Sequence, residues 1–296
     1  MYPGLTLRID DLADPAKRVA WADLLQDIFE LDMADFLAFD IWPAGFRAFS
    51  YLDGSVIVAN ISCKPTPLMI GGRHVMAGEL QGVATRPAYR RRGLVRDLMR
   101  HVLAYAEGRY ECLFLYTGIP DFYRRFGFRR LDEHRFRGRL SLQPGHRPSP
   151  SRCDLSLARP QDVALIRTLF ARRQPVSDVL GLIGNEGIFV HTTLMHPDWR
   201  LSYLPEQDVL IVWDQPDGII RLLDIVGSQI PSMAILDAII NPAGDRVEID
   251  VLFPPDRLDG SFRPIPQTPP DHDILMVHGP FDIEGQPFML PLTAVA

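Results

Sequence analysis

The sequence predicts an α/β (α+β) protein built from two tandem domains, and three observations carry this prediction. Residues 46–65 read as two strands around the turn Asp53-Gly54, the strongest short-range hairpin signal. Farther on, an apolar stripe with helical period lies between two strand-like runs, which indicates a strand, helix, strand crossover. Finally, the polar, proline-rich stretch 143-QPGHRPSPSRCD-154 has the composition of a linker, which divides the chain into domains 1–147 and 148–296.

The first segment opens with a strand in LTLRIDDLAD and a helix over 18–42, and its hairpin follows. After a turn at Gly71-Gly72, a long strand ends before Pro87, whose predecessor Arg86 must be extended. The crossover helix runs from about Leu94 to Glu107 and leads into the buried strand 111-ECLFLYT-117. A short helix over 121–126, ended by glycine, and a strand region from 128 complete the segment.

The second segment repeats this architecture faintly. It opens with LSLARPQDVALIRTLFARR, a short strand followed by a helix, and then shows the strand-like runs DVLIVWD, IIRLLDIVG, VEIDVLF and DILMVHG, with a helix around PSMAILDAII. Each domain is therefore expected to hold a mixed, mostly antiparallel sheet flanked by helices.

The composition is that of an ordinary globular protein, with 47% hydrophobic and 23% charged residues among 296. No apolar run approaches the roughly 20 residues of a membrane span, and acidic residues stand near the N-terminus where a signal peptide would be basic. A soluble, cytoplasmic protein is expected. Cys63, Cys112 and Cys153 form no CxxC pair, and His191 and His196 miss the i, i+4 spacing, so no metal site is expected.

Charge is divided unequally between the segments. Residues 1–147 carry 21 Lys+Arg against 17 Asp+Glu, and the remainder of the 31 and 37 leaves 10 against 20, so the net charges are +4 and −10. Only the first segment is suited to meet an anion. Since Lys17 and Lys64 are the only lysines, arginine is the usual cation of this chain, and a run of arginines could be an ordinary surface patch.

The run in 85-TRPAYRRRGLVRDLMR-100 has a more specific setting, because it lies in the loop between the long strand and the crossover helix. Gly93 permits a tight turn and a close approach of a ligand. The first amides of the helix and the positive end of its dipole favour an anion, and arginine adds forked donors for phosphate oxygens. A pyrophosphate suits such a site. The loop is neither a Walker loop nor a three-glycine dinucleotide fingerprint, and the chain has no nucleic-acid-binding signature.

These residues resemble the acetyl-CoA loop of the GNAT N-acetyltransferase superfamily, [RQ]xxGx[GA], here read from Arg90 to Val95. Val95 departs from the usual Gly or Ala and leaves less room beside the pyrophosphate. The segment RRRGLVRDLM resembles the corresponding loop of tandem-GNAT proteins of the enhanced intracellular survival type. Downstream, 122-FYRRFGF-128 resembles the FYxxxGF element of the family, in which the tyrosine points at the CoA sulfur. The alternative is a helix whose aromatic side chains simply pack in the core.

The resemblance implies a set of site residues. Backbone groups of Val83, Ala84 and Thr85 would bind the pantetheine arm, and a strand N–H would polarise the thioester carbonyl. The pyrophosphate would be held by Arg90, Arg91, Arg92, Gly93, Leu94, Val95 and Arg96. Tyr123 would be the general acid, protonated at pH 7 because a phenol has a pKa near 10. The general base would be Glu79, the carboxylate of Ala296, or water. Alternatively, Glu79 is a solvent-side strand residue without a catalytic role.

The second segment has no arginine and no glycine turn after its corresponding strand, where Ser228, Gln229, Ile230 and Pro231 stand. It is therefore interpreted as a degenerate GNAT-like domain that helps wall the acceptor cleft. The C-terminal sterol-carrier-like domain of the survival type is expected to be absent. In the family the first helices border the acceptor site, and here they carry six carboxylates without Lys or Arg, which would attract a cationic amine or simply form a solvated face: Asp23, Asp27, Glu30, Asp32, Asp35 and Asp40.

The sequence thus predicts an acetyl-CoA-dependent N-acetyltransferase that moves an acetyl group to a primary amine, with acetyl-CoA as co-substrate and no metal. Two other hypotheses remain open: a catalytically idle CoA-binding regulatory module, and a nucleic-acid binder, which would show steep salt dependence. No nucleic-acid or membrane partner is expected, and a homo-oligomer is possible.

Overall fold

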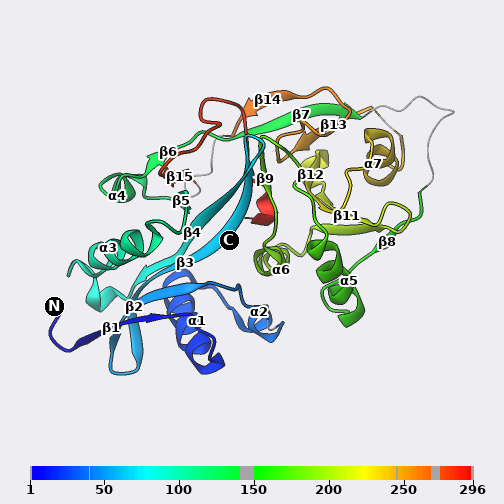
Figure 1. The fold of residues 1–296 in the computed structure, drawn as a ribbon. Helices are drawn as coiled ribbons and strands as arrows, with labels where there is room; N and C mark the ends of the chain where they lie inside the picture. Colours follow the sequence, from blue (N-terminus) through cyan, green and yellow to red (C-terminus); the bar gives the residue numbers. More distant parts are fainter. Residues whose placement is uncertain (1, 40, 141–149, 245, 268–273, 295–296) are drawn as a thin grey trace. The chain divides into compact units, whose positions relative to one another are not determined.

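The computed structural model describes residues 2–39, 41–140, 150–244, 246–267 and 274–294, and Figure 1 shows its ribbon. The chain forms two compact units, and neither is continuous in sequence. The first unit consists of residues 1–66, 76–130 and 274–280, and the second of residues 67–75, 131–273 and 281–296. The predicted boundary near residue 148 falls among residues outside those described.

The first sheet has the strand order β1-β2-β3-β4-β5-β15-β6, with β9 paired to the far end of β3. Its strands are β1 (Leu5–Asp10), β2 (Arg47–Asp53), β3 (Val56–Ile70), β4 (Arg73–Thr85), β5 (Cys112–Thr117), β6 (Arg129–Arg130), β15 (Ile274–His278) and β9 (Leu180–Leu182). The helical elements of the first unit are α1 (Pro15–Phe29), α2 (Ala34–Ala38), η1 (Pro87–Tyr89), α3 (Leu94–Ala106) and α4 (Pro120–Arg124).

The second sheet has the order β14-β7-β13-β12-β11-β10-β8. Its strands are β7 (His134–Leu140), β8 (Cys153–Asp154), β10 (Arg200–Leu204), β11 (Val209–Asp214), β12 (Ile220–Gly227), β13 (Val247–Val251) and β14 (Arg263–Pro266). The helical elements of the second unit are α5 (Pro160–Ala171), α6 (Glu186–Met195), η2 (Pro216–Gly218), α7 (Met233–Ile240) and η3 (Leu292–Ala294). The prediction of two mixed α/β sheets flanked by helices is confirmed.

The two sheets follow the same plan. Each contains one parallel pair, β4 with β5 in the first and β12 with β13 in the second, beside antiparallel neighbours. In each sheet the strand beyond the parallel pair comes from the other half of the sequence: β15 lies between β5 and β6, and β7 lies between β13 and β14. The architectural repeat predicted from the sequence is therefore present, but β7 and β15 are exchanged: each pairs with strands from the other half of the sequence.

The first helix is shorter than the pattern over 18–42 predicts. It begins at Pro15 behind the capping carboxylate of Asp14, and it ends at Phe29 because Glu30 adopts a left-handed conformation with φ 58° and donates its backbone N–H to Gln26. Asp32 then accepts the N–H of Ala34 at 2.8 Å, and α2 begins. Local side-chain hydrogen bonds of this kind favour helix starts and turns over helix interiors. The ends predicted for α3, β4 and β5 agree with the structure to within a residue.

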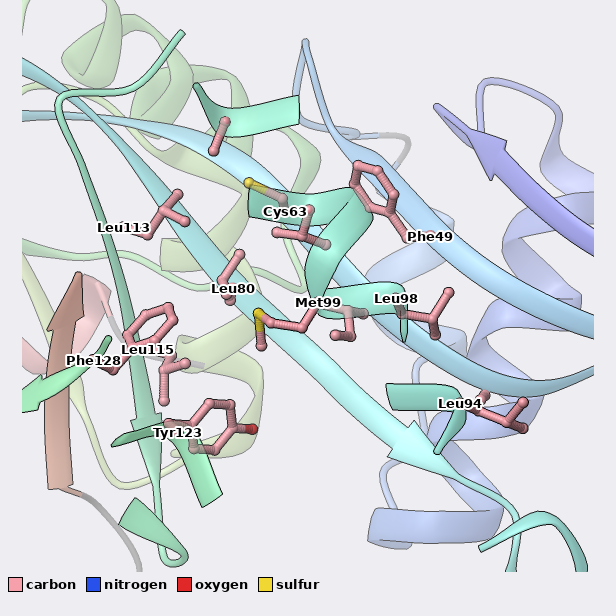
Figure 2. Close-up of a cluster of buried hydrophobic side chains, with 14 of the residues drawn as sticks. Phe49, Cys63, Leu80, Leu94, Leu98, Met99, Leu113, Leu115, Tyr123 and Phe128 are labelled. Atoms are coloured by element: carbon pink, nitrogen blue, oxygen red, sulfur yellow. The ribbon is translucent and has the colours of Figure 1, made fainter. Parts of the chain in front are cut away.

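The two faces of the first sheet differ in character. One face packs on α3, and Figure 2 shows Cys63 and Leu80 of the strands beside Leu98 and Met99 of the helix. The other face lies toward α1 and carries a polar stripe of fully buried side chains on β2 and β3, defined by Ser50, Asn60, Ser62, Lys64 and Thr66. Figure 1 shows α1 and α3 on opposite faces of this sheet.

One ion pair is sealed within the polar stripe. Lys64 is 0% exposed, and its Nζ lies 2.8 Å from Oε2 of Glu79 on β4. Thr66 donates its hydroxyl to the same oxygen at 3.2 Å. Burial lowers the pKa of Lys64 from its ordinary value, although Glu79 opposes this change. Both side chains of the pair are buried, so each charge is stabilised mainly by the opposite charge of its partner.

No helix in the described part of the chain is long and apolar enough to cross a membrane.

The buried pair yields a stability prediction. Replacing Lys64 with Met should lower the free energy of unfolding in urea by about 3–5 kcal/mol, because the Glu79 carboxylate would be left buried without a counter-charge. Replacing both residues by apolar side chains, Lys64→Met with Glu79→Leu, should recover most of that loss. The matched control is Arg124→Ala, which removes an exposed pair with Asp121 and should cost about 0–1 kcal/mol. Equal losses for Lys64→Met and the control would refute the prediction.

Candidate active site

The strands β4 and β5 separate near the middle of the first sheet. They pair in parallel over only three positions, Ala77–Glu79 with Cys112–Phe114. Beyond this point β4 continues to Thr85, while β5 continues to Thr117 and pairs on its other edge with β15. Residues 80–85 therefore have no hydrogen-bonded partner strand in β5. An extended ligand can add to such an open backbone edge as a further strand would.

A local distortion follows directly after the separation. Gly82, inside β4, has φ +58°, a left-handed conformation that a side chain would strain. A Cβ at this position would lie 3.3 Å from Nδ2 of Asn60, which itself donates to the Gly82 carbonyl at 2.8 Å. The distortion sets the direction of the next residues, Val83 to Thr85.

The loop after β4 ends at an uncapped helix. Arg86 is extended as predicted, with φ −57° and ψ 140°, and η1 follows. Arg91 has φ 61° and Gly93 has φ 83°, so the chain turns sharply into α3. No side chain caps α3, so the backbone N–H groups of its first turn receive no hydrogen bond acceptor from a capping side chain.

The arginines of this loop carry unneutralised charge. The side chains of Arg90, Arg91, Arg92 and Arg96 are exposed, and within the described residues none of them has a carboxylate partner. Arg90 donates to the Thr85 carbonyl at 3.1 Å, and Arg92 lies over the Tyr89 ring at 4.9 Å. Four cationic side chains without a carboxylate partner, beside the positive end of a helix, favour the binding of an anion.

The corresponding helix start in the second unit is closed. At the N-terminus of α7, the Ser232 side chain accepts the N–H of Ile235, and Asp259 accepts the N–H of Met233 at 2.6 Å. A carboxylate thus occupies the place that an anionic ligand would take. The two units differ in charge and in capping at equivalent elements.

Val95, the residue that departs from the family pattern, is half-buried and packs against the core beneath α3. Its neighbour Leu94 is 2% exposed. The valine side chain is thus partly used for packing at the start of the helix.

Tyr123 lies on α4 and is 5% exposed. Its ring packs edge-on against Phe122 and Phe128, and Figure 2 shows its hydroxyl pointing away from Leu115 and Phe128. Burial raises the pKa of the Tyr123 phenol to about 12, while a hydrogen bond with the Thr117 side chain acts in the opposite direction. The phenol is therefore fully protonated near neutral pH.

Glu79 stands at the last paired position of β4, opposite Phe114, where the two strands begin to separate. It is 4% exposed and is engaged by Lys64 and Thr66. It is thus neither a solvent-side residue nor a free carboxylate.

The acidic region before residue 46 is partly used by the fold itself. Arg86 forms ion pairs with Asp23, at 2.8 Å, and with Asp27. Asp32 accepts the N–H of Ala34 at the start of α2, and Glu30 and Asp35 remain exposed. Asp40 and Ala296 lie outside the described residues. Among the residues that are described, no group of three His, Cys, Asp or Glu side chains is arranged to hold a metal ion.

The parts that Asn60 and Lys64 play in this region, and the ion pairs of Arg86, were not predicted from the sequence. The alternation of β3 contained a signal, since Asn60, Ser62, Lys64 and Thr66 share one face of a strand whose other face is apolar. A polar face usually indicates solvent, and here it is buried instead.

The comparisons agree with this geometry. Residues 17–131 match the family model described as an acetyltransferase (GNAT) domain. The fold and this match support an acyltransferase. This part of the chain is a GNAT domain, and the predicted family is confirmed.

Solved structures show the same fold over nearly the whole chain. A probable N-acyltransferase from Enterococcus faecalis has a TM-score of 0.62 at 14% identity and covers 94% of this chain and 73% of its own. A GCN5-related N-acetyltransferase from Kribbella flavida has a TM-score of 0.58 at 19% identity, covering 93% and 71%. Eis1 from Mycobacterium abscessus has a TM-score of 0.58 at 14% identity, covering 92% and 73%. The search of curated proteins gave no match.

The buried phenol yields a prediction on stability and pH. Because the pKa of Tyr123 is about 12 when folded and near 10 when unfolded, the folded state keeps the proton while the unfolded state loses it between these values. The free energy of unfolding must therefore fall as pH rises through this window. Between pH 9 and pH 11 the wild type should lose about 1 kcal/mol more than Tyr123→Phe in urea titrations. Identical slopes for the two proteins would contradict a buried, protonated Tyr123.

Proposed function

We propose that this protein is an acetyl-CoA-dependent N-acetyltransferase whose first domain transfers the acetyl group to a primary amine. The observation that carries the proposal is the set of four exposed arginines without carboxylate partners at the open N-terminus of α3. Phosphate oxygens would accept hydrogen bonds from their guanidinium groups and from the free helix amides. Arg90, Arg91, Arg92 and Arg96, with the backbone from Gly93 to Val95, form the proposed pyrophosphate site.

The pantetheine arm would lie along β4. Its amide groups can pair with the open backbone edge of Val83, Ala84 and Thr85, which β5 leaves free. A backbone N–H of this segment would donate to the thioester oxygen as negative charge develops there. The open arginine loop and the open edge are adjacent along the chain, as one extended cofactor requires.

In the reaction, the amine nitrogen attacks the thioester carbon, the C–S bond breaks, and the thiolate takes a proton. Tyr123 would supply that proton and regain one from water, while the proton released by the amine leaves the site. Its raised pKa, about 12, keeps the phenol protonated, and the hydrogen bond with Thr117 orients it. The proton lost by the amine needs a base.

Three acceptors remain for that proton: Glu79, the carboxylate of Ala296, and water. Glu79 stands where the strands separate, which supports it, but its carboxylate already receives Lys64 and Thr66. A water molecule that passes the proton onward agrees best with this engagement. The exposed Glu30 and Asp35 would favour a cationic acceptor, such as a polyamine, an aminoglycoside or a protein lysine.

The second domain, as a degenerate GNAT-like domain, would bind no cofactor of its own, since Asp259 and Ser232 close its helix start. One observation favours a second candidate function, a catalytically idle CoA-binding module: the carboxylate at the separation point is tied in an ion pair.

A thiol-release assay separates the two. Acetyl-CoA is supplied with a panel of polyamines, aminoglycosides, amino acids and lysine peptides, and free CoA thiol is measured. If the protein is an enzyme, the amount of free CoA thiol increases with the concentration of at least one of the amines. Tight binding of acetyl-CoA by calorimetry without release from any amine would support the idle module instead.

The general acid is tested by Tyr123→Phe. This change should lower kcat by about 10²-fold, since general acid catalysis contributes that order of magnitude, and should leave the Kd of acetyl-CoA nearly unchanged. The matched control is Tyr203→Phe in the second sheet, whose hydroxyl donates to Asp208 at 3.0 Å. An unchanged kcat for Tyr123→Phe would remove this residue from the mechanism.

The pyrophosphate site is tested by Arg91→Gln and Arg92→Gln. Each should raise the Kd of acetyl-CoA about tenfold, because a hydrogen bond to a charged group is lost. Turnover of a short acetyl thioester that lacks the nucleotide should not change. Arg100→Gln, farther along α3 and paired with Asp97, is the control. Equal effects of Arg91→Gln and Arg100→Gln on the Kd of acetyl-CoA would contradict the assignment.

A further inference from the structure

Asn60 occupies the centre of the polar stripe and is 0% exposed. Its amide makes three hydrogen bonds. Nδ2 donates to the Gly82 carbonyl at 2.8 Å and to Ser62 Oγ at 2.9 Å, and Oδ1 accepts the hydroxyl of Ser50 at 2.8 Å. Burying an amide is costly unless its donors and acceptors are satisfied, so this arrangement fixes both the position and the orientation of the side chain.

The network reaches from α1 to β4. Trp21 of α1 donates its indole N–H to Ser62 Oγ at 3.0 Å. The Ser62 hydroxyl oxygen therefore accepts hydrogen bonds from both Trp21 and Asn60. On the other side, Asn60 faces the one distorted residue inside β4. The side chains of Asn60, Leu25 and Trp21 all lie within 4 Å of the position that a Cβ would take at Gly82.

The left-handed conformation of Gly82 is therefore held from outside the strand. Its carbonyl is bound by an amide that two further hydrogen bonds hold in place, and the space beside its Cα is filled. Residues 83–85 follow immediately, on the edge that β5 leaves open. A change in the turn at Gly82 would redirect the N–H groups of this edge by rotation of the backbone.

We propose that Asn60 is a positioning residue for acetyl transfer: its amide holds the Gly82 carbonyl and thereby sets the direction of the open backbone edge of Val83–Thr85, including the N–H that donates to the thioester oxygen. Asn60 touches no reacting atom and acts through Gly82. The inference rests on the proposed function, and it adds a residue of β3 to the machinery of β4. A displacement of about 1 Å at reacting groups costs on the order of a hundredfold in rate, so the side chain that holds this backbone affects the rate of transfer.

The test is Asn60→Ala, with Asn60→Ser as a second variant should the first fold poorly. The rate of thiol release is divided by the number of CoA-binding sites counted by calorimetry, so a partly unfolded sample does not imitate a loss of rate. Per site, kcat should fall about tenfold to a hundredfold, while the Kd of CoA should rise far less, because the arginine loop still holds the pyrophosphate when the pantetheine contacts of the strand edge weaken.

A double-mutant cycle asks whether Asn60 acts through Gly82. Gly82→Ala strains the left-handed conformation and places a methyl group against Nδ2 of Asn60. The two changes disturb the same backbone, so the loss of kcat in the double variant should be smaller than the product of the two single losses.

Ser202→Ala in the second sheet is the matched control. Ser202 is 0% exposed and accepts the indole N–H of Trp213 at 3.1 Å, so its removal also leaves a buried polar group unpaired. This variant should lower the melting temperature without lowering kcat per site.

The outcomes separate clearly. A kcat per site within twofold of wild type for both Asn60 variants, or fully multiplicative losses with Gly82→Ala, overturns the positioning role while the acetyltransferase stands. A wild type that binds CoA yet releases no thiol with any amine overturns the proposed function and this inference together.

Discussion

Three backbone pairs hold β4 and β5 side by side, and the parallel contact ends at Glu79 opposite Phe114. The arginine loop and the strand edge that are proposed to bind acetyl-CoA lie beyond that point. Had the pairing continued, the edge of residues 80–85 would be satisfied by β5 and closed to any extended molecule. The early end of the ladder therefore leaves an open sheet edge, normally a liability, to which an extended ligand can add.

The open edge needs support from both faces of the sheet, and the two faces provide it differently. Toward α3 the support is apolar packing around Leu80, Leu98 and Met99. Toward α1 it is hydrogen bonding by Ser50, Asn60 and Ser62, with the Lys64–Glu79 pair beside it. Apolar packing tolerates small shifts, whereas a fully satisfied buried network has one arrangement. The hydrogen-bonded support lies beside Gly82, the residue whose conformation determines the direction of the backbone that follows.

Much of the fold could be predicted from the sequence, because local signals agreed with one another. Pro87, the apolar stripe from Leu94 and the run ending at Thr117 placed β4, α3 and β5 within a residue of their observed ends. The break at Glu30 was missed because it depends on a left-handed residue without glycine, which local propensity does not predict.

The candidate site was predictable only in part. The arginine loop and Tyr123 stood out because each falls in a motif. The partners of Glu79 could not be foreseen, because Lys64 lies on a neighbouring strand and its pairing depends on sheet register. Likewise, the strands β7 and β15 carry no mark that assigns them to the sheet of the other half. Such long-range pairing is a property of topology and not of local pattern.

The exchange of β7 and β15 has a consequence for how this protein is made. Thr117 pairs with Ile274, so the first sheet cannot close while the intervening chain is still being synthesised. At about 5–20 residues per second, the nascent first half would wait on the order of ten seconds with the edge of β5 exposed. The product of a premature stop would expose the same edge, and it would be a natural client for chaperones and proteases. The two halves thus share a single fate during biogenesis, although each has its own hydrophobic core.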